Sequence, residues 1–260
     1  MIGKYTIIGA LLCITALVLL PGAVCADDDV LFQVSTIDAL LQGVYDGFYS
    51  FQDLKTYGDF GIGTFDSLDG EMVALDGNYY QVKADGVAYP VQGNTTTPFS
   101  TVTYFQADQN ITIKNARNFT DLSRQLDEKL PSKNAFFALR MDGTFPYIKT
   151  RSVPRQEKPY PRLADAVKNQ SVFEFSNVTG TVVGVWAPDF SKGLNVPGYH
   201  LHFITADRKA GGHILDLKVD EAIAKVDITA GFAMELPTNG DFYNVDLTQD
   251  LQSELETVEK

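Results

Sequence analysis

The sequence predicts an α+β protein made of two associated halves built on large mixed or antiparallel β-sheets with a few helices. Runs rich in Val, Ile, Tyr and Phe recur along most of the chain, and Asp-Gly pairs separate several of those between residues 69 and 150, which is typical of short connected strands. The regular alternation of strand and helix that would predict a doubly wound parallel sheet is missing. We expect an N-terminal α+β half at residues 27–155 and a C-terminal β-rich half at residues 156–260, which meet at a Pro-rich stretch, residues 154–161.

The first 26 residues are typical of a cleaved signal peptide. Lys4 precedes an apolar stretch, residues 5–20, that is shorter than the roughly 20 residues needed to span a bilayer. Cleavage is expected after Ala26 and would remove both cysteines, so disulfides cannot stabilise the mature chain. We therefore expect an exported protein. An uncleaved membrane anchor is less favoured because the stretch is short, and a lipoprotein attached through Cys25 is less favoured because residues 22–25 match the usual lipobox poorly.

The chain is acidic, with 33 Asp and Glu against 21 Lys and Arg and a formal net charge of −12. This charge argues against nucleic-acid binding, which needs clustered Lys and Arg, and against a stable membrane partner once the signal is removed. Five Asn-x-Ser/Thr motifs are potential glycan acceptors. They lie at Asn94, Asn110, Asn118, Asn169 and Asn177.

The N-terminal half is expected to begin with a helix and continue with strands. Residues 36–48 place Ile37, Leu40, Leu41 and Val44 at helical spacing. Residues 71–89 alternate Val- and Tyr-rich runs with Asp-Gly turns, which predicts a β-meander. An earlier Asp-Gly pair at 69–70 places Glu71 at the start of a strand.

The remaining elements are predicted from the same signals. Leu122, Leu126 and Leu130 predict a surface helix over residues 120–130 that ends at Pro131. Strands are expected over residues 135–139 and 145–150, around an Asp142-Gly143 turn. Further strands are expected over residues 173–175, 179–186, 199–205, 213–219 and 222–228, followed by a polar helix or tail over residues 246–258.

The three histidines of the chain predict one divalent-metal site. On a strand, residues i and i+2 point to the same face, so the imidazoles of His200 and His202 can converge on one point. His213 follows a segment, residues 207–212, that is typical of a turn, and a hairpin would return it to the same point. Three imidazoles with a fourth position open are the usual composition of a catalytic zinc site. The alternative is that these are ordinary hydrogen-bonded histidines, since His-x-His also occurs in strands that bind no metal.

Several short motifs, in order along nearly the whole mature chain, make the sequence resemble the α-acetolactate decarboxylase family. Each motif is weak alone, but the set is specific. The motifs are Gly61–Phe65 with Leu68–Glu71, Lys149–Arg151 before Gln156–Pro159, and Gly198–Phe203 with Gly211–His213.

The resemblance implies a carbon–carbon lyase that converts 2-acetolactate to acetoin, with Zn2+ as the cofactor and no organic cofactor. It implies that the three histidines hold the metal, with Glu71 beside it as ligand or proton relay. Arg151 would face the substrate and Thr64 would line the pocket. The family also uses a glutamate of the C-terminal tail near the metal, and among Glu254, Glu256 and Glu259 we favour Glu259. A homodimer is a further expectation from the resemblance.

The residue types suit this chemistry. Loss of CO2 leaves electron density on the carbon skeleton, and a metal chelated by the ketone and hydroxyl oxygens of the substrate is an electron sink for the enediolate. Arg151 could orient the substrate carboxylate through its planar set of donors. Glu71, if burial raises its pKa, could deliver the proton that completes acetoin.

Two other functions fit parts of the pattern. A cupin-like oxygenase or isomerase also uses His-x-His on a strand, but such proteins usually place a glutamate shortly afterwards and residues 205–208 contain none. A non-catalytic exported metal- or sugar-binding module would not require Arg151 or Glu71. Without the resemblance, Glu71 would be interpreted as a solvated turn residue, Arg151 as a member of a surface ion pair and Thr64 as an ordinary strand residue.

Overall fold

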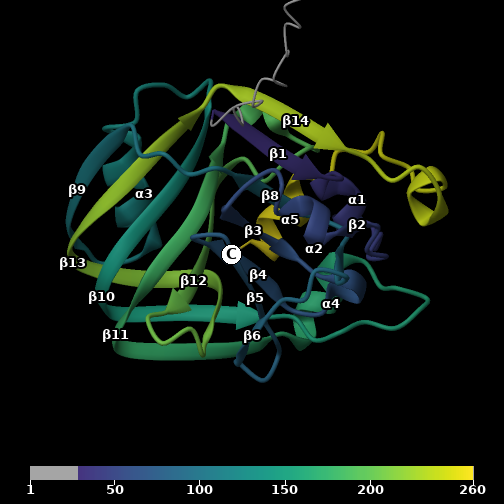
Figure 1. Cartoon of the computed structure of the whole chain (residues 1–260), viewed down its shortest axis with the longest axis horizontal. Helices are drawn as coiled ribbons and strands as arrows, with labels where there is room; N and C mark the ends of the chain where they lie inside the picture. Colours follow the sequence, from purple (N-terminus) through teal and green to yellow (C-terminus); the bar gives the residue numbers. More distant parts are fainter. Residues whose placement is uncertain (1–28, 260) are drawn as a thin grey trace, which may run out of the picture.

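The structure is a computed structural model that describes residues 29–259. It contains two large β-sheets, one mixed and one antiparallel, with short helices around them (Figure 1). The predicted α+β class is therefore confirmed. The predicted signal peptide lies outside the described residues. Within residues 29–259, no helix combines the length and the apolar character that a membrane span requires.

The first sheet has seven strands in the order β14-β1-β8-β3-β4-β5-β6. Its strands are β1 (Val30–Val34), β3 (Phe60–Thr64), β4 (Glu71–Leu75), β5 (Asn78–Val82), β6 (Ala88–Pro90), β8 (Ser100–Thr103) and β14 (Gly231–Glu235). Only the β1–β14 pair is parallel. The predicted meander is β4-β5-β6, and Glu71 is the first residue of β4 as expected. Asp76 and Gly77 join β4 to β5 with φ of 53° and 75°, the left-handed pair that a tight hairpin turn needs.

The second sheet is antiparallel and closes into a small barrel. Its strands are β9 (Gln109–Ala116), β10 (Phe136–Ser152), β11 (Ser171–Ala187), β12 (Gly198–Thr205) and β13 (Gly211–Thr229). Strand β10 pairs with both β11 and β13, which closes the ring β10-β11-β12-β13, and β9 extends the sheet from β13. Closure removes two exposed strand edges.

Three of these strands are longer than predicted. The turn expected at Asp142-Gly143 is wrong, because both residues pair with β11 inside the continuous strand β10. The Asp142 carboxylate accepts hydrogen bonds from Arg140 of the same strand and from Thr181 of β11, so the sheet satisfies this carboxylate. The separate strands predicted at 173–175 and 179–186 are one strand, β11, and those at 213–219 and 222–228 are one strand, β13.

The chain enters the barrel after β8, builds it from β9 to β13, and returns to the first sheet as β14. Strand β10 precedes the Pro-rich stretch, yet it pairs only with strands that follow it in the chain. The Pro-rich stretch is a loop from β10 to α4 (Leu163–Ala166). Prolines here interrupt secondary structure without separating the sheets.

The helices are α1 (Ile37–Leu41), α2 (Phe51–Leu54), α3 (Phe119–Asp127), α4 and α5 (Gln252–Val258), and a two-stranded ribbon is formed by β2 (Tyr49–Ser50) and β7 (Thr96–Thr97). Helix α1 is shorter than predicted. It begins at Thr36, whose hydroxyl accepts a hydrogen bond from the Ala39 amide, and is followed by Gly43 with a φ of 88°. Helix α3 corresponds to the helix predicted at residues 120–130, and α5 lies within the predicted tail element.

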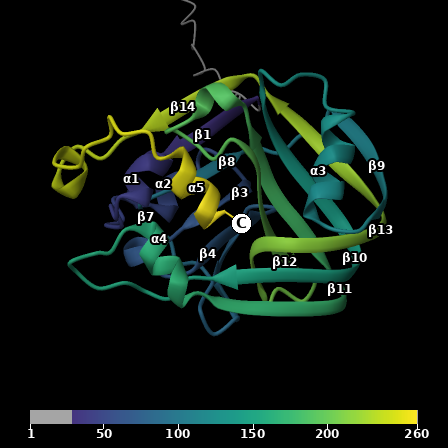
Figure 2. The same ribbon diagram turned by 180° about the vertical axis from the view of Figure 1, so that it is seen from behind.

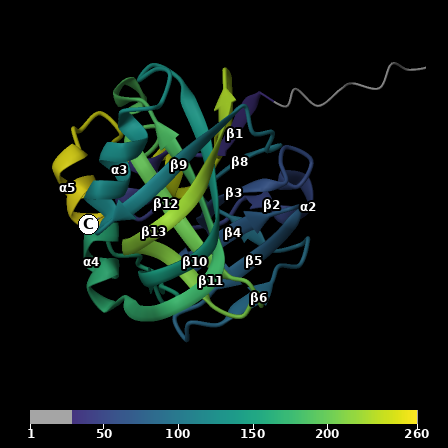
Figure 3. The same cartoon turned by 90° about the vertical axis from the view of Figure 1, so that its left-hand side faces the viewer.

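The barrel strands lie between α3 on one side and the first sheet on the other (Figure 3). Residues of both sheets share one apolar cluster that includes Ile62, Val73, Val183 and Ile204. Helices α1, α4 and α5 gather on a separate apolar cluster (Figure 2). The functional residues described below lie where the first sheet, the barrel and this helical cluster meet.

Phe145 is fully buried in the barrel core and packs edge-to-face on Phe203, so its substitution measures how much this core contributes to stability. We expect Phe145→Ala to lower the free energy of unfolding by about 3–5 kcal/mol, since it leaves a cavity in a packed interior. Phe190→Ala is the matched control, because Phe190 is 67% exposed and should change stability by less than about 1 kcal/mol. Urea denaturation measures both, and equal costs would contradict the assignment of Phe145 to the core.

Candidate metal centre

The three histidines meet on two neighbouring strands of the barrel. His200 and His202 lie on β12, and His202 pairs directly with His213 of β13, as the predicted hairpin requires. One ring nitrogen from each histidine lies within 4.8 Å of the others, and all three side chains are buried. The ring centroids are 5.0 to 5.3 Å apart. The strand geometry alone therefore produces a three-imidazole cluster.

The hydrogen bond of His202 fixes which nitrogen faces the cluster. Its Nδ1 lies 2.8 Å from the carbonyl oxygen of Met72, so Nδ1–H donates and Nε2 carries the lone pair. That Nε2 lies 3.2 Å from the Nε2 of His200. Zn–N bonds of about 2.0–2.1 Å at tetrahedral angles separate two ligand nitrogens by about 3.3 Å. The spacing of the His200 and His202 nitrogens therefore fits two ligands of one tetrahedral metal.

Burial keeps all three imidazoles neutral. It lowers the pKa of His200 to about 3, with the nearby Arg151 guanidinium acting in the same direction. Burial also places the pKa values of His202 and His213 well below their usual range. The neutral imidazole is the form that binds metals, so no proton has to be displaced at neutral pH.

Two carboxylates lie beside the histidines. The Oε2 of Glu71 is 3.7 Å from His202 Nε2, and the Oε2 of Glu259 is 3.7 Å from His213 Nε2. Glu71 is only 8% exposed, so it is not a solvated turn residue. Among the three tail glutamates the structure brings Glu259 to the histidines, whereas Glu254 forms an ion pair with Arg162 and Glu256 is exposed.

Arg151, near the end of β10, is the cation of the site. It is 4% exposed and pairs across the sheet with His213. Its Nη1 donates to Gln170 Oε1 at 3.2 Å, and its Nη2 lies 3.8 Å from Glu259 Oε1. Its Nε is buried and has no hydrogen-bond partner among residues 29–259. A buried donor left unsatisfied costs free energy, so this side chain is suited to an anionic ligand.

Both carboxylates are held toward the protonated form. Burial raises the pKa of Glu71 to about 7, although the Arg151 guanidinium opposes this rise and Glu259 adds to it. Burial likewise raises the pKa of Glu259, and Arg151 opposes it. A carboxyl group that titrates near neutrality can give up and regain a proton under ordinary conditions.

These groups line one small pocket of about 40 Å³. Its polar wall comprises Thr64, Glu71, Arg151, His200, His213 and Glu259, and its apolar wall comprises Ile37, Leu40, Leu68, Phe99, Val153 and Leu163. His202 lies behind this surface, against Met72. The Thr64 hydroxyl donates to the Gly70 carbonyl at 2.7 Å, so Thr64 serves the local backbone as well as the pocket wall.

Gly212 lets the barrel strands approach at the site. Its φ is 130°, and a Cβ at this position would lie 2.4 Å from the carbonyl oxygen of Arg151. A larger residue would therefore separate β13 from β10 at the Arg151–His213 pair. This gives a physical reason for the Gly-Gly-His motif in the sequence.

Several residues of the site carry no signal that sequence analysis can detect. Gln170, which holds Arg151, follows a short helical segment without any recognisable motif. The apolar wall comes from α1, α4 and separate loops, which only the tertiary fold brings together. The Met72 carbonyl is invisible to sequence analysis because it is a backbone atom.

The sequence and the fold of this chain were compared with known proteins, and the sequence and structure comparisons point to the same family. Residues 31–249 match the model of the alpha-acetolactate decarboxylase family. The alpha-acetolactate decarboxylase of Methanosarcina mazei is 64% identical over 232 residues, which cover 89% of this chain and 81% of the relative. The enzyme of Bacillus licheniformis is 43% identical over 232 residues, covering 89% of this chain and 92% of the relative. The crystal structure of alpha-acetolactate decarboxylase from Bacillus subtilis strain 168 superposes with a TM-score of 0.86 at 41% identity, covering 88% of this chain and 99% of that chain.

The burial of Glu71 predicts how stability depends on pH. Because its folded pKa is raised from 4.5 to about 7, Glu71 favours the folded state below pH 4.5, and this contribution is lost as the pH rises through about 7. In chelator-treated protein, we expect Glu71→Gln to gain stability relative to the natural chain over this range, by about 3 kcal/mol at most.

Urea denaturation at several pH values between 4 and 8 measures the difference. Glu157→Gln, at an exposed glutamate, controls for the removal of one negative charge. Parallel stability curves for Glu71→Gln and the natural chain would show that the Glu71 carboxylate is solvated.

Proposed function

Because the chain belongs to the alpha-acetolactate decarboxylase family and is therefore a carboxy-lyase, we propose that it decarboxylates 2-acetolactate to acetoin with Zn2+ at the histidine centre. One observation carries the proposal. Three neutral imidazoles converge within 4.8 Å at a pocket that also holds the buried Arg151 and Glu71 and the partly buried Glu259.

The donor set supports zinc in particular. His200, His202 and His213 would hold the metal. Glu71 and Glu259 both lie close enough for one of them to be a further ligand, and otherwise that position would be open to substrate. Three nitrogen ligands with one open position are the usual arrangement of catalytic zinc. When bound, the metal supplies a Lewis acid that accepts electron density as the carboxylate leaves.

Arg151 would bind and orient the substrate carboxylate. Its guanidinium offers several donors in one plane, including the Nε without a protein partner among the described residues. After the C–C bond breaks and CO2 departs, the electron pair of that bond remains on the substrate as an enediolate. The same cation then stabilises the enediolate oxygens.

Glu71 would supply the proton that completes the reaction. With a pKa raised to about 7, a substantial fraction of this side chain is protonated at neutral pH. Transfer of that proton to the carbon that lost CO2 forms the C–H bond of acetoin, and the resulting carboxylate regains a proton from solvent. The apolar wall of the pocket limits water beside the reacting carbon.

The family assignment favours this reaction over a cupin-like oxygenase or isomerase and over a binding module. The positions of Arg151 and Glu71 in the same pocket as the histidines also favour catalysis, because a metal-binding module has no need of a proton donor there.

We further propose that the protein is exported after cleavage at Ala26 and forms a homodimer. The leader composition supports export, and the resemblance to the family supports the dimer. A centre of histidine and carboxylate ligands suits an oxidising compartment, because residues 27–260 contain no cysteine.

Intact-mass measurement of protein from its natural host tests export, with an N-terminus at Asp27 as the expected result. Mass added beyond the polypeptide would report glycans on the five sequons, whose asparagines are all exposed. Sedimentation velocity tests the dimer. A chain that retains residues 1–26, or one that sediments as a monomer, would contradict the respective proposal.

The decisive test of function is acetoin formation from racemic 2-acetolactate by residues 27–260, with chelator and with Zn2+ added back. We expect activity that chelation removes and Zn2+ restores. His202→Ala should lose both metal and activity, because it removes a ligand. Arg151→Ala should retain the metal and lose activity by about 10²–10³-fold, because it removes only the contact to the carboxylate.

Metal analysis and steady-state kinetics distinguish the variants. Lys149→Ala, on the same strand and outside the pocket lining, is the control for Arg151→Ala. Activity that survives in metal-free His202→Ala protein would overturn the metal-dependent mechanism. Absence of acetoin formation by a folded, zinc-loaded chain would overturn the proposed reaction.

A further inference from the structure

The loop at residues 65–70 joins two walls of the pocket. Strand β3 ends at Thr64 and β4 begins at Glu71, and these two residues pair directly across the sheet. Leu68, within the loop, lines the apolar side of the same pocket. The shape of this loop therefore influences both the carboxyl group and the apolar surface that face the substrate.

Two consecutive residues of the loop are strained. Ser67 has φ 61° and ψ 26°, and Leu68 has φ 56°, so both occupy the left-handed region that favours glycine. For a residue with a Cβ this conformation is unfavourable, because the Cβ lies too close to the following carbonyl oxygen. Such strain persists only where surrounding contacts enforce it, and it is concentrated at functional sites.

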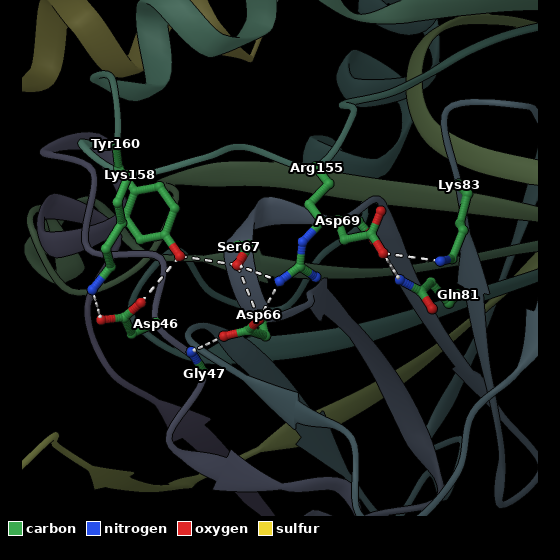
Figure 4. Close-up of polar contacts among 10 residues, drawn as sticks. All are labelled: Asp46, Gly47, Asp66, Ser67, Asp69, Gln81, Lys83, Arg155, Lys158 and Tyr160. Atoms are coloured by element: carbon green, nitrogen blue, oxygen red, sulfur yellow. Dashed lines mark hydrogen bonds and ion pairs between the residues drawn. The ribbon is translucent and has the colours of Figure 1, made fainter.

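Ser67 is enclosed by hydrogen bonds. Its amide donates to the Tyr45 carbonyl at 2.8 Å, and its carbonyl accepts from the Gln156 amide at 2.8 Å. Its hydroxyl accepts from Arg155 Nη2 at 2.9 Å and lies 2.9 Å from the Tyr160 hydroxyl (Figure 4). Ser67 is 3% exposed, whereas Arg155 is exposed, so the network runs from a buried serine to the surface.

The partners of Ser67 are themselves anchored. The Tyr160 hydroxyl donates to Asp46 Oδ1 at 3.0 Å, and Arg155 pairs with Asp66 at 3.1 Å. Asp66 also accepts a hydrogen bond from the Gly47 amide at 3.0 Å. Figure 4 shows these contacts as one connected network. The Pro-rich stretch and the segment at residues 45–47 thus hold the loop together.

A second set of contacts fixes the far end of the loop. Gln81 Nε2 donates to the Asp69 carbonyl at 2.6 Å, and Lys83 pairs with the Asp69 carboxylate at 3.0 Å. Both partners lie on or beside β5, next to β4. The β5 contacts therefore hold the loop at Asp69, and the hydroxyl contacts of Ser67 hold the earlier part of the loop.

We propose that Ser67 and Tyr160 are positioning residues, which lock the 65–70 loop so that Glu71 lies against His202 and Leu68 closes the apolar wall. The histidines lie on the barrel strands β12 and β13, and His202 is also hydrogen-bonded to the Met72 carbonyl of β4, so the network makes no direct contact with the histidines and acts on Glu71 and Leu68. This inference rests on the proposed function, since it assigns the network to the decarboxylation site.

Tyr160→Phe and Ser67→Ala each remove one hydroxyl of the network. Tyr160→Phe keeps the ring that packs on Tyr45 at 5.2 Å between centroids. We expect both to lower kcat by about 10- to 100-fold, because small misplacement of a reacting group has effects of this size. Metal content should stay at the natural level. Hydrogen exchange of the backbone amides at residues 66–72, measured by mass spectrometry, should become faster.

Glu157→Ala is the matched control. Glu157 belongs to the same stretch, but its side chain is exposed and takes no part in the network of Figure 4. We expect its kcat and its exchange at residues 66–72 to stay within twofold of the natural chain.

Ser67→Gly separates positioning from stability. Glycine relieves the strain at φ 61° but removes the hydroxyl, so we expect stability close to that of the natural chain together with reduced kcat. Natural kcat and exchange in the hydroxyl-removing variants would overturn the proposal, and so would loss of metal in parallel with activity. If the natural chain forms no acetoin, the proposed function fails, while the exchange rates still decide whether the network holds the loop.

Discussion

The hydrogen bond from His202 Nδ1 to the Met72 carbonyl is the contact on which the geometry of the site depends. It connects β12 of the barrel to β4 of the first sheet, and Met72 directly follows Glu71. One bond therefore sets the tautomer of His202 and the distance of Glu71 from the cluster. The register of β12 against β13 then places His213, and the docking of α5 adds Glu259.

Local signals in the sequence were sufficient where the relevant neighbours are close in the chain. The Asp-Gly turns around β4 and β5 and the hairpin of the three histidines follow from short patterns. The closed barrel could not be predicted, because β10 and β13 are joined through residues far apart in sequence. Asp142-Gly143 misled the prediction, since a turn-like pair is tolerated in a strand when Arg140 and Thr181 satisfy the carboxylate.

In the candidate site, too, some residues could be predicted from local patterns and others could not. The histidines were identified from spacing and rarity, whereas Glu71, Arg151, Thr64 and Glu259 were named through the resemblance to a family. Gln170 and the strained Ser67 were not identified, because neither an amide behind an arginine nor a left-handed serine leaves a periodic pattern. Sequence analysis also does not reveal that Glu71 is buried, and this burial is what raises the pKa of Glu71 toward neutrality.

The three histidines share the β12–β13 hairpin, whereas Glu71 and Glu259 come from β4 and the end of α5, so the complete centre exists only after both sheets and the helical cluster have assembled. A divalent ion present during folding would therefore have access to the histidine hairpin before the carboxyl groups close around it. The ions present where the chain folds, as well as the affinity of the ligand set, would then decide which metal this centre takes up.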